Sequence, residues 1–315
     1  MGNLLVQIEI TPEILFQVSE VTRLLGQFEG HRTGVRGALK EKIFIQNVYA
    51  NLALEGSTLS TEQVQRIRDG ESVGAMVDEM AQAKAFLRAY GKTSDFSVQS
   101  MKDMLTAFLV MNEGLSLNPK NGTGEAGQSW NTHMKEALEL LGVLFRYVQD
   151  ERMIHPLLKA SIFHFQMVQI QPFVRYSAAV ARLWHRMLLA DYHPVFAMVP
   201  LEFQLKQQQQ QYLNTLQVEN SRSSLQEFVR FSIYVAYDAL FMLLDRMDDS
   251  IKNVNDRLAF AKLHFGGERI TRKKYMDLFK SIGSATASRD LKAGLDAGLL
   301  EKRGAKARTT YAFIN

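Results

Sequence analysis

Apolar residues recur every three or four positions along most of the first 250 residues, which is the spacing of amphipathic helices. A Thr-Pro-Glu start at residues 11–13 opens the first of them, with Thr11 as N-cap. Ser60 or Thr61 starts a short helix that runs to Arg68. The same spacing predicts further helices over residues 35–54, 73–90, 97–111, 131–149, 156–169, 178–190, 201–217 and 223–247.

Two stretches interrupt this pattern. Gly56 follows Glu55 at the end of the helix expected over 35–54, where glycine suits a left-handed C-terminal cap. Residues 112–131 are rich in Gly, Asn and Ser and have no period, which predicts a long loop.

The last 65 residues change character. A helix expected at 252–264 is followed by a short helix within 270–283, by a second one from residue 284, and by an alternating segment around Gly304 that is typical of a hairpin. Three helices and a basic hairpin describe a winged helix-turn-helix. The residues expected to contact DNA are Thr286, Ser288, Arg289 and Lys292 near the start of the recognition helix and Lys302, Arg303, Lys306 and Arg308 along the wing.

Charge divides the chain in the same way. The whole chain has a formal net charge of +4. Residues 251–315 hold 14 Lys/Arg and 6 Asp/Glu, whereas residues 1–250 hold 23 and 27. A basic tail on a mildly acidic body indicates an anionic partner for the tail, with double-stranded DNA the first candidate. The alternative is a charged, solvated module used for dimerisation or docking.

The overall composition sets limits on function and location. A length of 315 residues favours two domains, and 46% hydrophobic with 22% charged residues is ordinary for a globular protein. Because the chain has no cysteine, disulfides and thiolate metal sites are excluded. No signal peptide and no uncharged apolar stretch of about 18 residues is visible, so we expect a cytoplasmic protein without a membrane span.

A longer pattern lies around residues 171–182, which read QPFVRYSAAVAR. This stretch resembles the hallmark of the Fic family of nucleotidyltransferases, His-Pro-Phe-x-Asp/Glu-Gly-Asn-Gly-Arg-x-x-Arg. The lead-in HPL at 155–157, the segment ALEGSTLSTEQV at 53–64 and the pair Tyr212 and Leu216 also match the family, and the likeness covers roughly residues 35–235.

The resemblance implies a mainly α fold, a Fic-like helical bundle with a C-terminal winged-helix (α+β) domain. The expected boundaries are 1–249 for the helical domain and 250–315 for the winged helix. Within the helical domain, N-terminal helices would occupy 1–110 and the Fic core about 111–235.

The residues at the hallmark positions do not suit the family's chemistry. Gln171 stands where the family has its catalytic His and cannot act as a general base. Arg175 replaces the carboxylate that holds the metal. Side chains replace the phosphate-binding glycines around Ser177, and Ala179 replaces the first motif Arg. We therefore expect no intact catalytic residue, no metal site and no cofactor.

The resemblance also pairs two retained residues. Arg182 is the second motif Arg and Glu55 matches the regulatory Glu, so we expect a partly buried salt bridge between them. It would serve as a structural clamp, or, in a live enzyme, as an autoinhibitory contact. His155 is expected to cap a helix and His164 to lie in the core, rather than to bind metal.

These observations leave three hypotheses. The first is a catalytically degenerate Fic-like protein that binds DNA through its winged helix as a transcriptional regulator. The second is a divergent Fic enzyme that transfers AMP or another nucleotidyl group to a protein hydroxyl, uses ATP and magnesium, and is restrained by Glu55. The third is a bare protein-interaction module. A homodimer and an unidentified protein partner stay open in each.

Overall fold

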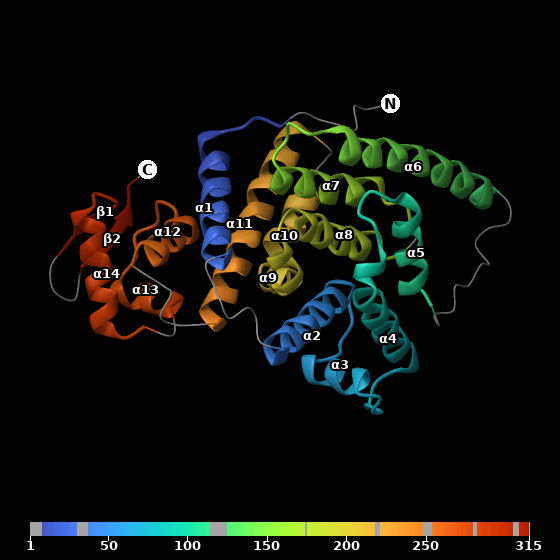
Figure 1. Cartoon of the computed structure of the whole chain (residues 1–315), viewed down its shortest axis with the longest axis horizontal. Helices are drawn as coiled ribbons and strands as arrows, with labels where there is room; N and C mark the ends of the chain where they lie inside the picture. The colour runs from blue at the N-terminus through green and yellow to red at the C-terminus, as the bar shows by residue number, and fades with distance from the viewer. Residues whose placement is uncertain are drawn as a thin grey trace. The chain divides into compact units, whose positions relative to one another are not determined.

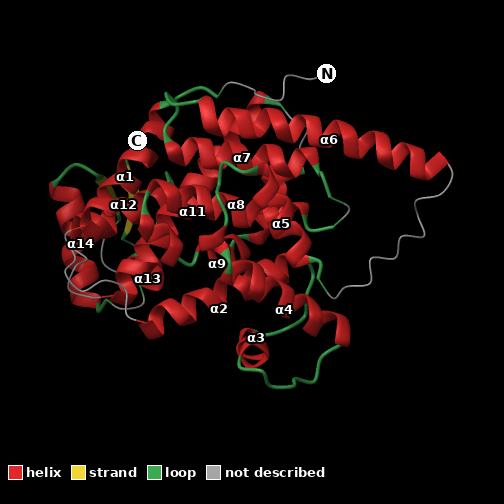
Figure 2. Ribbon diagram, turned by 45° about the vertical axis from the view of Figure 1, so that its right-hand side comes forward, coloured by secondary structure: helices red, strands yellow, loops and turns green. Residues whose placement is uncertain are grey.

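The computed structural model describes residues 8–29, 37–113, 125–173, 175–217, 221–247, 254–279, 282–304 and 309–314. Over these residues the protein is mainly α, and its only strands form one small sheet (Figures 1 and 2). The expected fold class is therefore confirmed. The chain separates into two compact units, residues 1–240 and 241–315, with the division inside α11. The boundary expected at 249/250 stays a prediction.

The first unit consists of helices joined by short connections. Its first half contains α1 (Pro12–Glu29), α2 (Gly37–Leu54), α3 (Thr61–Arg68), α4 (Val77–Gly91), the 3₁₀ turn η1 (Thr93–Asp95) and α5 (Met101–Met111). Its second half contains α6 (Glu125–Asp150), α7 (Pro156–Ile170), α8 (Ser177–Tyr192), η3 (Pro194–Met198), α9 (Leu201–Gln207), α10 (Gln209–Leu216) and most of α11 (Arg222–Met247).

The antiparallel pair α7 and α8 forms the centre of this unit (Figure 1). Both helices are buried nearly all round, including Phe163 and Phe165 of α7 and Trp184 of α8. Helices that are buried on nearly every side need neighbouring elements on every side. α2, α5 and α6 supply part of that cover, and α2 in turn packs along α9.

α1 lies along α11, as Figure 1 shows. Glu13 pairs with Arg230 at 3.3 Å, and the backbone N–H of Glu9 donates to Gln226. α11 carries charged residues within its apolar sequence. Within the described part of the chain, no helix has both the length and the apolar character needed to cross a membrane.

The helix ends follow the expected capping chemistry. Thr11 Oγ1 accepts the N–H of Ile14 at the start of α1. Ser60 caps α3 in a reciprocal capping box with Gln63. Gly56, just after α2, has φ of 89°, the left-handed conformation in which glycine is least strained. These predictions are confirmed.

Two expected elements are wrong in detail. Residues 125–131, assigned to the loop 112–131, begin α6 instead, while residues 114–124 lie outside the described part. Glu, Ala and Gln are good helix formers, and they outweigh the Gly and Asn content that suggested a loop. The helix expected over 201–217 is two helices, because the backbone leaves helical geometry at Gln208.

The C-terminal unit contains α12 (Val254–Phe265), α13 (Arg272–Leu278), α14 (Ser284–Asp296) and the antiparallel strands β1 (Leu300–Arg303) and β2 (Thr310–Phe313). Leu300 pairs with Phe313 and Arg303 with Thr310. Ile270 adds a bridge to Tyr311 on the other edge of β2. The helices and the hairpin follow in the order that the sequence predicts.

The core of this unit contains a buried ion pair. Arg257 of α12 donates from two nitrogens to Asp290 of α14, at 2.6 and 2.9 Å, and Tyr275 of α13 donates to the same carboxylate at 3.3 Å. One carboxylate thus ties all three helices together. Gly294 lets α14 approach β1, because a Cβ there would lie 2.7 Å from Leu300 Cδ1.

Candidate functional site

The loop between α7 and α8 has two residues in the left-handed region. Gln171 ends α7 with φ of 45°, and Tyr176 precedes α8 with φ of 63°. Both conformations are costly for residues other than glycine, on the order of 1 kcal/mol each. The loop keeps a backbone shape that suits glycine although its sequence contains none.

Side chains on α4 and α5 hold this loop in place. The Tyr176 ring is buried and meets the ring of Phe86 edge-on at 5.3 Å. Burial raises the pKa of Tyr176 above its ordinary value. Phe173 stacks on Phe108 at 3.8 Å. Arg175 is exposed, with its guanidinium 5.2 Å from the Tyr176 ring centroid. The loop is therefore packed on its inner side.

The first turn of α8 closes the loop from within. Ser177 Oγ donates to the carbonyl of Phe173 and accepts its N–H, both at 3.0 Å. Ala179 is buried in the same turn, and its carbonyl accepts from Asn51 Nδ2 at 3.3 Å. Both hydrogen bonds of the Ser177 hydroxyl are thus made within the loop.

Arg182, one turn further along α8, is 2% exposed and is bonded at each of its three nitrogens. Nε donates to Asn51 at 2.6 Å, Nη1 donates to Tyr212 at 3.3 Å, and Nη2 donates to Glu55. The predicted Glu55–Arg182 salt bridge is therefore present. Burial by itself would lower the pKa of Arg182, but the oxygens of Tyr212 and Glu55 raise it, so the guanidinium stays charged.

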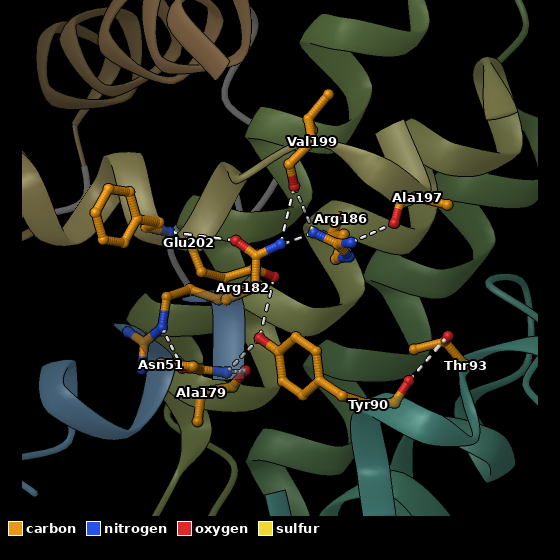
Figure 3. A network of polar contacts seen from close by, with 11 residues as sticks. Asn51, Tyr90, Thr93, Ala179, Arg182, Arg186, Ala197, Val199 and Glu202 are labelled. Atoms are coloured by element: carbon orange, nitrogen blue, oxygen red, sulfur yellow. Dashed lines mark hydrogen bonds and ion pairs between the residues drawn. The ribbon is translucent and has the colours of Figure 1, made fainter. Parts of the chain in front are cut away.

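A chain of buried polar contacts continues from Asn51 (Figure 3). Asn51 Nδ2 donates to the Tyr90 hydroxyl at 2.7 Å, and that hydroxyl donates to Glu202 at 3.0 Å. Arg186 donates to the other oxygen of Glu202 at 3.1 Å and to the carbonyls of Val199 and Ala197. Two buried arginines are thus each matched by one carboxylate, which limits the cost of burying them.

The buried tyrosines of the network keep their protons. Burial raises the pKa of Tyr90 well above its ordinary value, with the Glu202 carboxylate adding to the effect. Burial likewise raises the pKa of Tyr212, although Arg182 opposes the shift. Both hydroxyls therefore remain hydrogen-bond donors at neutral pH.

The histidines of this unit have structural positions. His155 caps α7, accepting the N–H of Leu157 at 3.2 Å, as predicted. His164 is fully buried and bonded to the Tyr212 hydroxyl at 2.9 Å, and the adjacent His185 contacts Ser232 at 3.3 Å. Burial lowers the pKa of both, to about 3 for His185. No group of three potential metal ligands occurs among the described residues.

Two cavities lie along the C-terminal half of α8, and neither is lined by loop residues 171–176. The larger, about 600 Å³, is bordered by Phe44, Phe96 and Met187, and it reaches Tyr90 and Arg186. The smaller, about 250 Å³, lies beside α6 and α7. The larger cavity therefore touches the far end of the polar network.

In the C-terminal unit, the described residues expected to contact DNA lie on two elements. Thr286 is half-buried in the first turn of α14, whereas Ser288, Arg289 and Lys292 are exposed along that helix. Lys302 and Arg303 are exposed on β1. Lys306 and Arg308 lie outside the described residues.

Ion pairing distinguishes two groups among the basic residues of this unit. Arg257, Arg269 and Lys274 have carboxylate partners in Asp290, Glu301 and Glu268. Among the residues that the structure describes, no ion pair occurs at Arg272, Lys273, Arg289, Lys292, Lys302 or Arg303. The second group can offer its charge to a ligand.

Sequence reasoning missed the second half of the polar network. Arg186 lies four residues after Arg182 and so on the same helix face, and Glu202 is a lone acid in an apolar stretch after Pro200. These signals mark a buried polar pair, but they do not identify the partners. Asn51 and Tyr90 link the two arginines through contacts that span 39 to 131 residues of sequence.

Known proteins resemble the chain along much of its length, although no protein-family model matches it. A curated protein from Drosophila willistoni, "Protein adenylyltransferase Fic", is 26% identical over 214 residues, which cover 63% of this chain and 41% of that protein. The chain thus spans about two fifths of the length of its curated relative.

Solved structures of Fic proteins also resemble this chain in fold. A Fic family protein from Desulfovibrio desulfuricans matches 98% of this chain and 99% of its own, with a TM-score of 0.66 and 21% identity. Fic-1 from C. elegans matches 76% of this chain and 73% of its own, with a TM-score of 0.58 and 19% identity. The chain is therefore similar in sequence to a Fic protein and has the fold of the Fic structures.

Proposed function

We propose that this chain is a catalytically degenerate Fic protein that acts as a DNA-binding regulator through a winged helix in its C-terminal unit. The helical unit would be a scaffold or sensor. The proposal that the protein is catalytically degenerate depends above all on Tyr176. Its side chain is buried against Phe86 at the position where the family motif has its first glycine.

The residues present do not fit a magnesium-bound nucleotide. Transfer of AMP needs a base for the acceptor hydroxyl, a carboxylate for the metal and open backbone N–H groups for phosphate. Gln171 has no group that titrates, and Arg175 would repel a divalent cation. Tyr176 stands where the motif has a glycine, and its ring packs against Phe86. In this proposal the loop therefore does not support AMP transfer.

Arg182 supports the same proposal. Its three nitrogens are bonded to Asn51, Tyr212 and Glu55 and its side chain is 2% exposed, so a phosphate could reach the guanidinium only if the surrounding groups moved. Removing one partner of a buried charged pair typically costs about 3–5 kcal/mol. In this chain we assign Arg182 and Glu55 the role of a clamp between α8 and α2.

The DNA-binding half depends on charge and element order. α12, α13, α14 and the hairpin follow in the order of a winged helix. Exposed cations lie on α14 and β1, and none of them has an ion-pair partner in the part of the chain that the structure describes. In this proposal the start of α14 enters the major groove, with Arg289 and Lys292 beside the backbone. Lys302 and Arg303 lie at the hairpin.

Fluorescence anisotropy with a short labelled duplex tests this half. We expect binding whose log K falls linearly with log salt. Arg289→Gln with Lys292→Gln should weaken binding, whereas Arg269→Gln, at an ion-paired arginine, should not. If the full chain fails to bind any duplex at low salt, the DNA-binding half is wrong.

A second candidate is a divergent transferase restrained by Glu55. The Glu55–Arg182 ion pair and the name of the Drosophila relative favour it. It predicts binding of ATP with magnesium, and transfer of labelled nucleotide that increases in Glu55→Gly. Calorimetry and thermal shift with ATP and magnesium separate the two: no heat and no shift in either the wild type or Glu55→Gly would reject the transferase. A cytoplasmic location, a homodimer and a protein partner stay predictions.

A further inference from the structure

A groove of about 800 Å³ opens on the C-terminal unit between α13, α14 and β2. Among the described residues expected from sequence to contact DNA, Ser288 lines it. The described residues of its lining are mostly polar or basic, and none of them is Asp or Glu: Thr271, Arg272, Lys273, Met276, Ser284, Ser288, Thr309 and Tyr311. The groove therefore suits an anionic ligand.

Two cations of this groove are available to such a ligand. Arg272 and Lys273 are both exposed, and neither pairs with a carboxylate among the described residues. The next residue, Lys274, is also exposed, but it pairs with Glu268 and does not line the groove. On α13, Arg272 and Lys273 thus direct two available positive charges to the groove, whereas the charge of Lys274 is balanced by a carboxylate.

Ser288 sets the position of Arg272. Its hydroxyl accepts a hydrogen bond from Arg272 Nη1 at 3.1 Å and donates to the carbonyl of Ser284 at 2.9 Å. Arg272 is therefore attached to α14 while using one of its five N–H donors. The donor that Ser288 was expected to offer to DNA is already engaged, so the guanidinium is the group left for the ligand.

We propose that this groove binds the phosphate backbone of duplex DNA through Arg272 and Lys273, with Ser288 as a positioning residue. The inference rests on the proposed DNA-binding function and adds a site to it. Guanidinium, ammonium and hydroxyl groups are the side chains that most often contact phosphate oxygens, and such contacts are independent of base sequence. The groove shares α14 with the exposed Arg289 and Lys292, so one duplex can contact both.

The salt dependence of binding by the full chain tests the groove. We expect Arg272→Gln with Lys273→Gln to weaken binding of a random-sequence duplex and to reduce the slope of log K against log salt by about 2, roughly 1 for each lost phosphate contact. The loss should be the same for duplexes of different sequence. Ser288→Ala should give a smaller loss of the same kind, and Ser288→Thr, which keeps the hydroxyl, should restore it.

Arg269→Gln with Lys274→Gln is the matched control, because it removes two charges that already have carboxylate partners. Equal slopes in the groove variant and the control would overturn the groove while leaving DNA binding in place. If the wild type binds no duplex, the proposed function itself fails. If the groove variant bound single-stranded RNA more weakly than the wild type but bound duplex DNA equally well, duplex DNA would not be the ligand of the groove. Circular dichroism of each variant is the check that it is folded.

Discussion

The guanidinium of Arg182 and the carboxylate of Glu55 form an ion pair that joins the middle of α8 to the end of α2, across 127 residues of sequence. Arg182 is 2% exposed on its side chain and Glu55 16%. The buried charge of Arg182 is therefore balanced by a carboxylate, Glu55, that is partly accessible to water. The two residues should therefore respond unequally to substitution.

Arg182→Met should destabilise the protein by about 3–5 kcal/mol, because it leaves Asn51, Tyr212 and Glu55 without their common donor. Glu55→Gln should cost less, about 1–2 kcal/mol, since Asn51 and Tyr212 still bind the guanidinium and water can approach. Urea denaturation measures both. Glu13→Gln, in an exposed pair with Arg230, is the control and should leave the midpoint unchanged. Equal effects of the two core substitutions would contradict the asymmetry.

Gln171 offers a test of backbone strain. Its φ of 45° is left-handed and its side chain is exposed, so Gln171→Gly should stabilise the protein by about 0.5–1 kcal/mol. Gln210→Gly, at an exposed helical position of α10, should destabilise it by about 1 kcal/mol. Thermal denaturation of both variants shows whether each substitution raises or lowers the stability of the protein. A loss of stability in Gln171→Gly would mean that its side-chain contacts outweigh the strain.

The sequence predicts much of the fold because most helices carry an apolar period, and several also begin at a capping side chain. Thr11, Ser60 and Gly56 end or start helices where expected. The start of α6 and the break at Gln208 were missed, since weak local preferences decide them. The Glu55–Arg182 contact could be expected only through the family resemblance. Nothing local indicates that Glu202 lies beside Tyr90, because that contact depends on how whole helices pack.

The buried histidines predict a loss of stability in acid. Burial lowers the pKa of His185 to about 3, whereas an unfolded histidine titrates near 6.5. Between these values only the unfolded chain binds the proton, so stability falls as the pH drops below about 6.5. His185→Gln should shrink the difference in unfolding free energy between pH 7.5 and 5.0 by about 2 kcal/mol, whatever it costs at pH 7.5. Urea titrations at the two pH values measure this, and an unchanged difference would contradict a neutral His185.

Gly294 tests the packing on which the proposed DNA surface depends. A Cβ at this position would lie 2.7 Å from Leu300 Cδ1 and 3.1 Å from Leu258 Cδ2, so Gly294→Ala should push α14 away from β1 and cost about 1–3 kcal/mol. Gly26→Ala, on the exposed side of α1 with nothing within 4 Å, should instead stabilise the protein by up to about 1 kcal/mol. Duplex affinity should fall in Gly294→Ala and stay unchanged in Gly26→Ala, because only the first moves α14. Replacing Leu300 with Val in the Gly294→Ala background should recover part of both losses, since it shortens the side chain that the new methyl group meets.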